Sequence, residues 1–310
     1  MVLNIIFEQM KQLLLIGCVL LALNGNSQTF FERDTTLNVK RTAWTSGIIG
    51  AGWIGSTVSL QAVWYKEHWS DFKFFDDSKE WLGMDKFGHA YTSYSLTKDI
   101  SSIYHWAGLN RNNSLIVGSS VTFGFQLTLE VLDGFSDKWG FSWSDLGTNT
   151  LGIAWHAWQD LLWKEQRFKL KFSAHTTPYA QFRPNTLGST IAERLLKDYN
   201  GQTYWLNINP GMFLSRNSKF PKWLSFSFGY SVDEKLHGDL NHYQVITENG
   251  KALDFHAKSQ FLFSLDIDFE EIPVKKPWLK TLFKALNHVK IPFPTMIITG
   301  KELDWHPFYF

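Results

Sequence analysis

The residues best suited to chemistry begin in the stretch "MDKFGHAYTSY", Met84 to Tyr94. It places a carboxylate, an ammonium and an imidazole close together at Asp85, Lys86 and His89. Asp85 and His89 are four residues apart, so they share one face of a helix. Such a trio can bind a metal ion, transfer protons or hold a buried helix in place. The choice among these roles depends on the polar residues that lie beside it.

Two later segments offer such residues. Glu130 and Asp133 lie in the last turn of a predicted helix that ends near Gly134. The helix dipole disfavours acids there unless a positive group lies opposite. Asp145 and Asn149 lie four apart on the next predicted helix. If the three helices turn these faces toward one another, they form a polar cluster of seven residues: Asp85, Lys86, His89, Glu130, Asp133, Asp145 and Asn149.

A divalent metal ion is one group that this cluster could bind. The predicted metal ligands are His89, Glu130 and Asp133, with Asp145 as an alternative to Asp133. Mixed nitrogen and oxygen ligands suit zinc, manganese or iron, and a bound ion lowers the pKa of water enough for hydrolysis. Without a metal, His89, Glu130 and Asp145 are the candidate catalytic residues, with the imidazole and a carboxylate as general acid and base. The sequence contains no HExxH, P-loop, GxSxG or dinucleotide motif, so the cofactor is not identified.

Each cluster residue also has a role that involves no chemistry. Asp85 can cap the N-terminus of its helix. Asp145 follows Ser142 by three residues in "SWSD", which is a capping-box spacing. His89 and Asn149 can be buried hydrogen-bonding groups between helices. A structural network therefore stands beside the catalytic and metal-binding hypotheses.

These segments belong to a predicted helical domain, residues 36–163. Its first helix, Thr42 to Tyr65, carries no charge, and small residues recur four apart from Gly47 to Ser59. That spacing predicts close packing against another helix. Helical periodicity predicts three more helices, over about 85–106, 113–132 and 144–163. The N-terminal half is therefore expected to be a bundle of about four helices.

Strict alternation replaces the helical period in the second predicted domain, residues 164–310. Apolar residues alternate with Ser and Gly in "LSFSFGYSV", and "FKLKFSAH", "TYWLNINPGMFL" and "FLFSLDIDF" are further candidate strands. They predict an antiparallel β-sheet or a small β-barrel-like domain with apolar residues outward. Lys276 to Pro292 form an amphipathic helix suited to a membrane surface or to covering a sheet. The expected fold class is α+β.

The N-terminus predicts export from the cytoplasm. Lys11 precedes the apolar stretch Leu13 to Leu23, and small residues precede Gln28. This order predicts a signal peptide over residues 1–27. "LIGC" also fits a lipoprotein cleavage site, which would anchor the chain through Cys18. The expected location is the periplasm or the outer membrane, with a lipid anchor on Cys18 as the alternative.

Composition favours a membrane-associated protein. Aromatic residues make up 16% of the chain and charged residues only 19%, and aromatic residues gather at membrane interfaces. The net charge of +1 gives no reason to expect nucleic acid. Expected partners are membrane lipid and an envelope protein. We predict a structural or binding role centred on the cluster; the alternative is a metal-dependent or acid–base hydrolase acting on an envelope lipid or glycan.

The same motifs resemble a known family. "MDKFGHAYTSY" followed by "LEVLDGFSDKWGFSWSDLGTNTLG" is similar to the YfiM-like predicted bacterial envelope lipoproteins, domain of unknown function 2279, over about residues 82–158. A looser similarity extends to VanZ-like membrane proteins, and the β-rich half resembles a longer version found in Bacteroidetes-type bacteria. The resemblance implies an envelope location and a polar site, without naming a reaction. The residues it implies are Asp85, Lys86, His89, Glu130, Asp133, Gly134, Asp145, Asn149 and Gly152.

Overall fold

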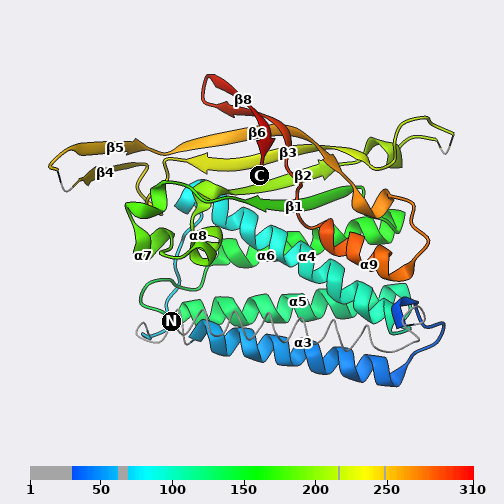
Figure 1. Cartoon of the computed structure of the whole chain (residues 1–310). Helices are drawn as coiled ribbons and strands as arrows, with labels where there is room; N and C mark the ends of the chain where they lie inside the picture. The colour runs from blue at the N-terminus through cyan, green and yellow to red at the C-terminus, as the bar shows by residue number, and fades with distance from the viewer. Residues whose placement is uncertain (1–29, 62–68, 216, 248) are drawn as a thin grey trace.

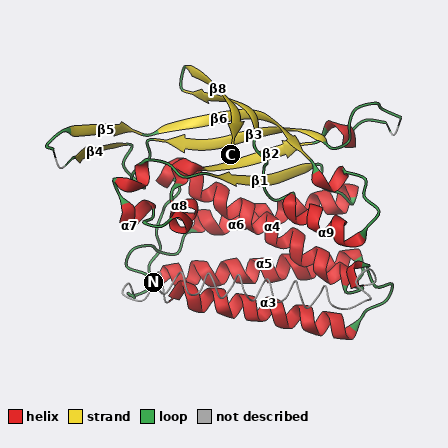
Figure 2. Cartoon of the chain, in the orientation of Figure 1, coloured by secondary structure: helices red, strands yellow, loops and turns green. Residues whose placement is uncertain are grey.

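Helices and strands occupy separate layers of the molecule (Figures 1 and 2). The computed structural model describes residues 30–61, 69–215, 217–247 and 249–310, so the expected signal peptide and Cys18 lie outside the described residues. The long helices are α3 (Val39–Leu60), α4 (Met84–Trp106), α5 (Arg111–Gly134) and α6 (Trp143–Trp163). A six-stranded antiparallel sheet follows. The α+β class and the count of about four long helices are confirmed.

Helices α4, α5 and α6 pack against one another beneath the sheet. The side chains of Asn110 and Ser142 cap α5 and α6, each accepting a hydrogen bond from the backbone amide three residues later. Gly152 on α6 permits a close approach to α4, since a Cβ at this position would lie 2.2 Å from the Ala90 carbonyl oxygen. This approach brings the polar faces of α4 and α6 together.

The start of α4 differs from the prediction that Asp85 caps it. Gly83, with a φ of 81°, is the N-cap, and Asp85 lies in the first turn. The Asp85 carboxylate accepts hydrogen bonds from Lys86 and Tyr199. The capping prediction was wrong because the chain enters the helix through a left-handed glycine, which leaves the carboxylate available to other partners.

Two residues before Gly83 also adopt left-handed backbone angles. Trp81 and Leu82 have φ values of 50° and 52°, a conformation that is costly for residues other than glycine. Residues of the β-rich half hold them there: the Trp81 amide donates to the carbonyl of Gly238 in the loop after β3, and the hydroxyl of Tyr230 on β3 donates to the Leu82 carbonyl. The β-rich half therefore fixes the position at which α4 begins.

Helix α3 contacts the described part of the bundle away from its small-residue stripe. Among the described residues, nothing lies within 4 Å of a Cβ placed at Gly47 or Gly55. The small-residue stripe therefore makes no tight contact with the described part of the chain. Instead, α3 contacts the bundle through residues such as Trp53, whose ring lies 5.9 Å from that of Phe125 on α5.

Helix α5 is the one helix in the described ranges that is long and apolar enough to cross a membrane, and 28% of its most apolar stretch is buried. Within the bundle it contacts both α4 and α6. Its buried residues include Gln126 and Glu130. The polar side of α5 thus faces its two neighbours.

The six strands follow the order β1-β2-β3-β6-β7-β8, and all neighbours are antiparallel. They are β1 (Phe168–Ala174), β2 (Gln202–Ile208), β3 (Leu224–Asp233), β6 (Lys258–Ile267), β7 (Phe293–Thr299) and β8 (Glu302–Tyr309). β4 (His242–Ile246) and β5 (Ala252–His256) form a separate hairpin. Of the two expected arrangements, the structure has the antiparallel sheet. Short helices join its parts, including α7 (Pro184–Leu187), α8 (Ile191–Lys197) and the amphipathic α9 (Pro277–Leu286).

The two faces of the sheet have opposite polarity. On the inner face, Lys169 pairs with Asp268 at 2.6 Å and Lys171 pairs with Asp266 at 2.8 Å, and all four side chains are almost fully buried. The other face is apolar from β2 to β8. One row in register across it consists of Leu206, Phe228, Phe263, Met296 and Trp305. Most polar residues of the strands therefore point inward and most apolar residues outward, and the inner face also holds the buried cluster of Trp205, Leu262 and Ile297.

Helix α4 covers the apolar face over the first strands. The Phe87 ring stacks on Tyr230 with centroids 4.8 Å apart, and the Tyr91 ring lies 5.7 Å from Phe172. The Tyr91 hydroxyl also donates to the His288 carbonyl. These contacts hold α4 against the sheet along the half of the helix that carries the polar cluster.

Candidate functional site

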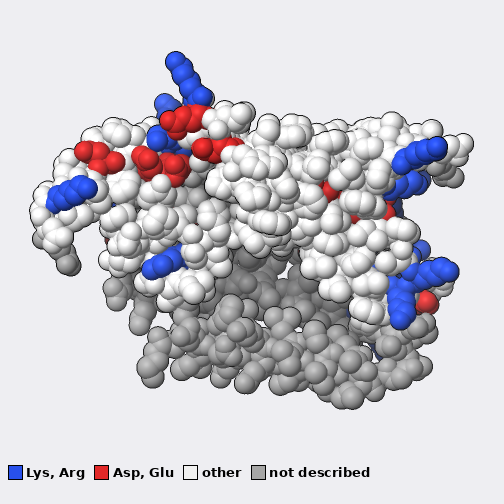
Figure 3. Space-filling view, turned by 45° about the horizontal axis from the view of Figure 1, so that its top comes forward, with Lys and Arg blue, Asp and Glu red and all other residues white. Residues whose placement is uncertain are grey.

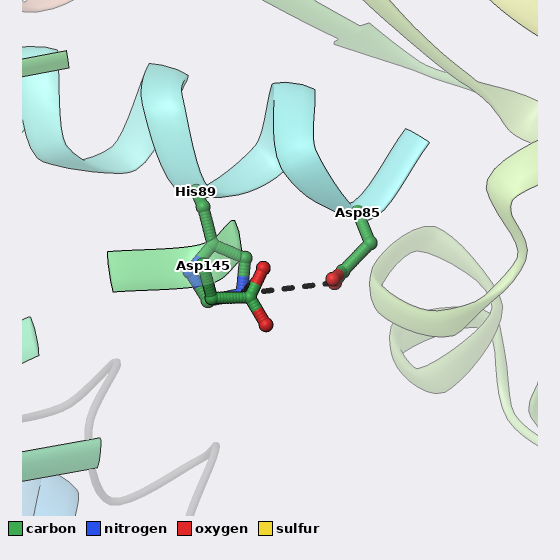
Figure 4. Close-up of side chains that lie close together, drawn as sticks. All are labelled: Asp85, His89 and Asp145. Atoms are coloured by element: carbon green, nitrogen blue, oxygen red, sulfur yellow. Dashed lines mark ion pairs between the residues drawn. The ribbon is translucent and has the colours of Figure 1, made fainter. Parts of the chain in front are cut away.

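Helices α4 and α6 bring three potential metal ligands together: Asp85, His89 and Asp145 (Figure 4). The Nε2 atom of His89 lies 3.7 Å from Asp85 Oδ1 and 3.6 Å from Asp145 Oδ1. Ligand atoms of all three residues lie within 4.8 Å of one another. Two ligand atoms that each lie about 2.1 Å from a tetrahedral ion are about 3.4 Å apart. The observed separations therefore need little adjustment to place one ion among all three residues.

The second nitrogen of His89 is held by Asn149. Nδ1 lies 3.1 Å from Asn149 Oδ1, and the same oxygen accepts hydrogen bonds from Ser93 Oγ and Gln126 Nε2, both at 2.9 Å. Because this oxygen is an acceptor, Nδ1 carries the hydrogen, and Nε2 of the neutral ring presents its lone pair to the two aspartates. Metal-binding histidines in proteins are commonly oriented in this way.

Glu130 lies on the other side of the imidazole from the aspartates. Its Oε1 atom is 3.7 Å from His89 Nδ1 and accepts a hydrogen bond from Asn149 Nδ2 at 3.3 Å. Glu130 is 1% exposed. Asp133, in the next turn of α5, is partly buried, and its negative charge raises the pKa of Glu130. Among the described residues, the convergent ligand group contains neither Glu130 nor Asp133.

Lys86 forms ion pairs with the aspartates that lie on the Nε2 side of His89. Its Nζ atom lies 3.0 Å from Asp85, 2.5 Å from Asp145 and 2.7 Å from Asp77. Ser142 Oγ, which caps α6, also donates to Asp77 at 2.6 Å. Lys86 therefore orients both candidate aspartate ligands and links them to the segment before α4.

Tyr199 reaches the site from the β-rich half. Its hydroxyl donates to Asp85 Oδ1 at 2.9 Å, and its ring lies 5.2 Å from that of Trp81. Oδ1 is also the Asp85 atom that faces His89. Hydrogen bonds to ligand carboxylates orient them for a metal. Tyr199 is thus the residue of the second half that fixes a candidate ligand of the first half.

Comparison with known proteins places this site inside a family match. Residues 71–160 match the family model "Predicted periplasmic lipoprotein (DUF2279)". No curated protein and no solved structure matches the chain. The match supports an exported protein that is periplasmic or lipid-anchored. The matched segment holds the whole site except Tyr199, while the YfiM-like and VanZ-like resemblances remain predictions.

The site gathers three carboxyl groups, Asp85, Glu130 and Asp145, around one imidazole and one ammonium group. Burial raises the pKa of Asp145 to about 7 and that of Glu130 to about 8. Burial acts on His89 in the opposite direction, but the carboxylates around it outweigh this effect and raise its pKa. For Asp85, burial is outweighed by the charges of His89 and Lys86, which lower its pKa. A divalent cation bound here would lower the pKa values of the carboxyl groups and compete with the proton on His89.

The structure joins most of the residues predicted from the sequence and adds others. Asp85, Lys86, His89, Glu130, Asp145 and Asn149 lie in one connected network. Sequence reasoning missed Asp77, Ser93, Gln126 and Tyr199. Ser93 follows His89 by four residues and Gln126 precedes Glu130 by four, so the helical spacing contained that signal. Asp77 and Tyr199 lie outside the α-helices, Tyr199 in a single 3₁₀ turn, where no periodicity indicates them.

Proposed function

We propose that this protein is an exported cell-envelope protein that binds a divalent transition-metal ion at Asp85, His89 and Asp145. One observation carries the proposal: His89 Nε2 faces two carboxylate oxygens at 3.6 and 3.7 Å while Nδ1 is engaged by Asn149. In the neutral ring all three facing atoms are acceptors, and their separations exceed hydrogen-bond lengths. Asp145 Oδ1 already pairs with Lys86 and Asp85 Oδ1 with Tyr199, so a cation would be a further partner for these two oxygens and the first for the Nε2 lone pair. Mixed nitrogen and oxygen ligands favour zinc, manganese or iron.

Metal binding gives the site a structural and binding role. The ligands come from two helices, α4 and α6, so an ion would bind the folded arrangement far better than the unfolded chain. Such preferential binding adds to the free energy of unfolding. The network of Ser93, Gln126, Asn149 and Glu130 surrounds this arrangement with satisfied polar groups. The ion would therefore hold α4 and α6 in register.

A membrane-associated position in the periplasm or at the outer membrane is part of the proposal. The outer face of the sheet supports it, since Phe261 is 59% exposed and Trp305 61% exposed. Large exposed apolar faces mark contact with membranes or other proteins. An envelope lipid is the partner we favour, and an envelope protein is the alternative.

Hydrolysis of an envelope lipid or glycan is the second candidate function. The observation that favours it is that three protein ligands leave a coordination position for water, as in catalytic zinc sites. Asp85 and His89 each retain 24% exposure of the side chain, and Asp145 retains 8%. Glu130 lies on the Nδ1 side of His89, away from the aspartates. In this candidate function Glu130 would position His89, and a bound water would be the nucleophile.

Elemental mass spectrometry of the purified mature protein tests the metal proposal. We expect near-stoichiometric metal in the wild type and its loss in His89→Ala and in Asp145→Asn. His306→Ala is the matched control, because it removes an exposed imidazole from β8. Calorimetric titration with Zn²⁺ and Mn²⁺ follows if the protein is purified without metal. No metal after purification and no heat of binding in the titration would refute the proposal.

A further inference from the structure

Helix α9 carries an exposed apolar stripe. Trp278, Leu282 and Leu286 are spaced four apart and are 43%, 43% and 42% exposed, and Val289 beyond the helix is 47% exposed. Residues four apart share one face of a helix. These four residues are called the α9 stripe below. Side chains of this size are normally buried, so a stripe of them at one surface indicates a contact.

The neighbouring side of α9 holds it on the molecule. The Phe283 ring packs against Phe269 with centroids 5.7 Å apart, and Lys284 Nζ donates to Ser102 Oγ on α4. Backbone hydrogen bonds of Phe172 on β1 with His288 and Lys290 fix the chain just after the helix. The helix is therefore a docked element, and the α9 stripe points away from the body that holds it.

Helix α9 and its flanking residues are rich in lysine. Residues 272–300 contain five lysines and no acid, although Lys290 is fully buried and four acids precede this segment at residues 266–271. Lys275, Lys276 and Lys280 are exposed. Figure 3 shows basic side chains, with acidic side chains beside them, at the side of the molecule where Figure 1 places α9, and further basic side chains on the opposite side. The exposed lysines of α9 favour an anionic partner.

We propose that α9 binds the surface of an anionic phospholipid bilayer. The stripe would enter the boundary between headgroups and acyl chains, and the lysines would contact the anionic headgroups. Helices with a Trp- and Leu-rich face and a Lys-rich remainder bind membranes in this way. Each lysine near an anionic surface raises the affinity about fivefold. At ten residues the helix is about 15 Å long, half the thickness of the hydrocarbon core, so it lies along the membrane surface.

The chemistry of the stripe favours lipid over a protein partner. A protein interface needs roughly one hydrogen bond per 100–200 Å². Within the stripe only the Trp278 indole can donate, and indole groups prefer the membrane interface. The lysine stems are long enough to let their ammonium groups reach the headgroups from either side of the helix. This inference is independent of the metal site.

A fluorophore on α9 tests the proposal without relying on any other anchor. Leu282→Cys in the full chain would carry an environment-sensitive label, and the parent chain treated with the same reagent corrects for label at Cys18. We expect a blue shift and protection from an aqueous quencher with vesicles containing phosphatidylglycerol. Vesicles of phosphatidylcholine alone should give a much smaller shift. Added salt should reverse the effect, because it screens surface charges.

Charge-reversal variants identify the contact. Lys275→Glu, Lys276→Glu and Lys280→Glu together should lower the affinity for phosphatidylglycerol vesicles by about a hundredfold or more and abolish the shift. The control combines Lys79→Glu, Lys251→Glu and Lys301→Glu, which makes the same charge change at exposed positions elsewhere. The control should keep the shift.

Three outcomes would overturn the proposal. The first is an equal loss of vesicle affinity in both triple variants, which would mean that the binding depends on the net charge of the protein and not on α9. The second is an unshifted label at position 282 together with vesicle binding that Phe261→Ser and Ile298→Ser abolish, which would assign the contact to the sheet face. The third is a blue shift without vesicles that depends on protein concentration, which would assign the stripe to a second copy of the chain.

Discussion

The Nδ1 atom of His89 lies 3.1 Å from the side-chain oxygen of Asn149. This contact between α4 and α6 determines which nitrogen of the imidazole faces Asp85 and Asp145. The proposed metal binding and the packing of α4 against α6 therefore involve the same amide. The predictions below separate these two contributions.

Replacing Asn149 with leucine should destabilise the protein strongly. The substitution keeps the size of the side chain but removes the acceptor for His89, Ser93 and Gln126. Each buried group left unsatisfied costs about 1–3 kcal/mol. Chemical denaturation of the metal-free protein measures the loss. Asn112→Leu, at an exposed position on α5, is the control and should change the free energy of unfolding by about 0.5 kcal/mol or less.

Tyr199→Phe should weaken metal binding and leave the fold intact. The variant removes only the hydroxyl that donates to Asp85 Oδ1. Loss of such a supporting hydrogen bond lowers metal affinity about 10–100-fold. A competition titration with a zinc chelator measures the affinity. Tyr204→Phe, whose hydroxyl bonds to Gln202 on its own strand, should bind zinc as the wild type does; equal losses in the two variants would argue against the assigned role of Tyr199.

Gly152→Ala and Gly147→Ala on α6 should have opposite effects on stability. At Gly152 the new Cβ would lie 2.2 Å from the Ala90 carbonyl oxygen, so α4 and α6 must separate, at a cost of about 1–3 kcal/mol. At Gly147 nothing in the described chain lies within 4 Å. The alanine there should stabilise the helix by about 0.5–1 kcal/mol. Urea unfolding measures the free energy of unfolding of both variants. Similar free energies would mean that α4 and α6 can separate at Gly152 without loss of stability.

His156 should make the protein less stable in acid. Burial lowers the pKa of its imidazole to about 4, chiefly by excluding water, with further lowering from Lys98 and Arg111 and opposition from Asp160. Below the ordinary histidine pKa of about 6.5, His156 is protonated in the unfolded chain but stays neutral in the folded chain. The contribution of His156 to the free energy of unfolding is therefore fully present above pH 6.5. It is lost as the pH falls toward 4, which lowers the free energy of unfolding by about 3 kcal/mol.

The variant His156→Gln isolates this effect. Denaturation midpoints between pH 7 and 4 should fall less steeply in His156→Gln than in the wild type. The control, His306→Gln, removes an exposed imidazole and should keep the wild-type slope. If the midpoints of His156→Gln fall with pH as steeply as those of the wild type, the acid sensitivity comes from groups other than His156.

Sequence patterns predicted the helices of the site well, because their periodicity and caps are local. Ser142 caps α6 as its spacing to Asp145 indicates, and α6 ends at Trp163 as expected. The cap of α4 was missed because Gly83 adopts a left-handed angle that the β-rich half supports through Trp81 and Leu82. No local pattern contains that information.

The composition of the site was partly predictable for the same reason. Asp85, His89, Asp145 and Asn149 meet because four-residue spacings on two helices face each other. Tyr199 was beyond prediction, since its contact with Asp85 joins residues 114 apart in the sequence. The choice of Asp85 as the third convergent ligand depends on how α4 is rotated against α6, and packing at Gly152 sets that rotation.

The reach of Tyr199 to Asp85 has a consequence for the order in which the protein matures. An exported chain crosses the inner membrane from its N-terminus, so all three proposed ligands arrive in the periplasm before Tyr199 does. Until the strands dock, Asp85 lacks the hydrogen bond that orients it, and the segment before α4 lacks the support of Tyr230. On the proposed metal site, high-affinity loading would follow the docking of the strands, so the periplasmic metal supply, rather than that of the cytoplasm, would decide which ion binds.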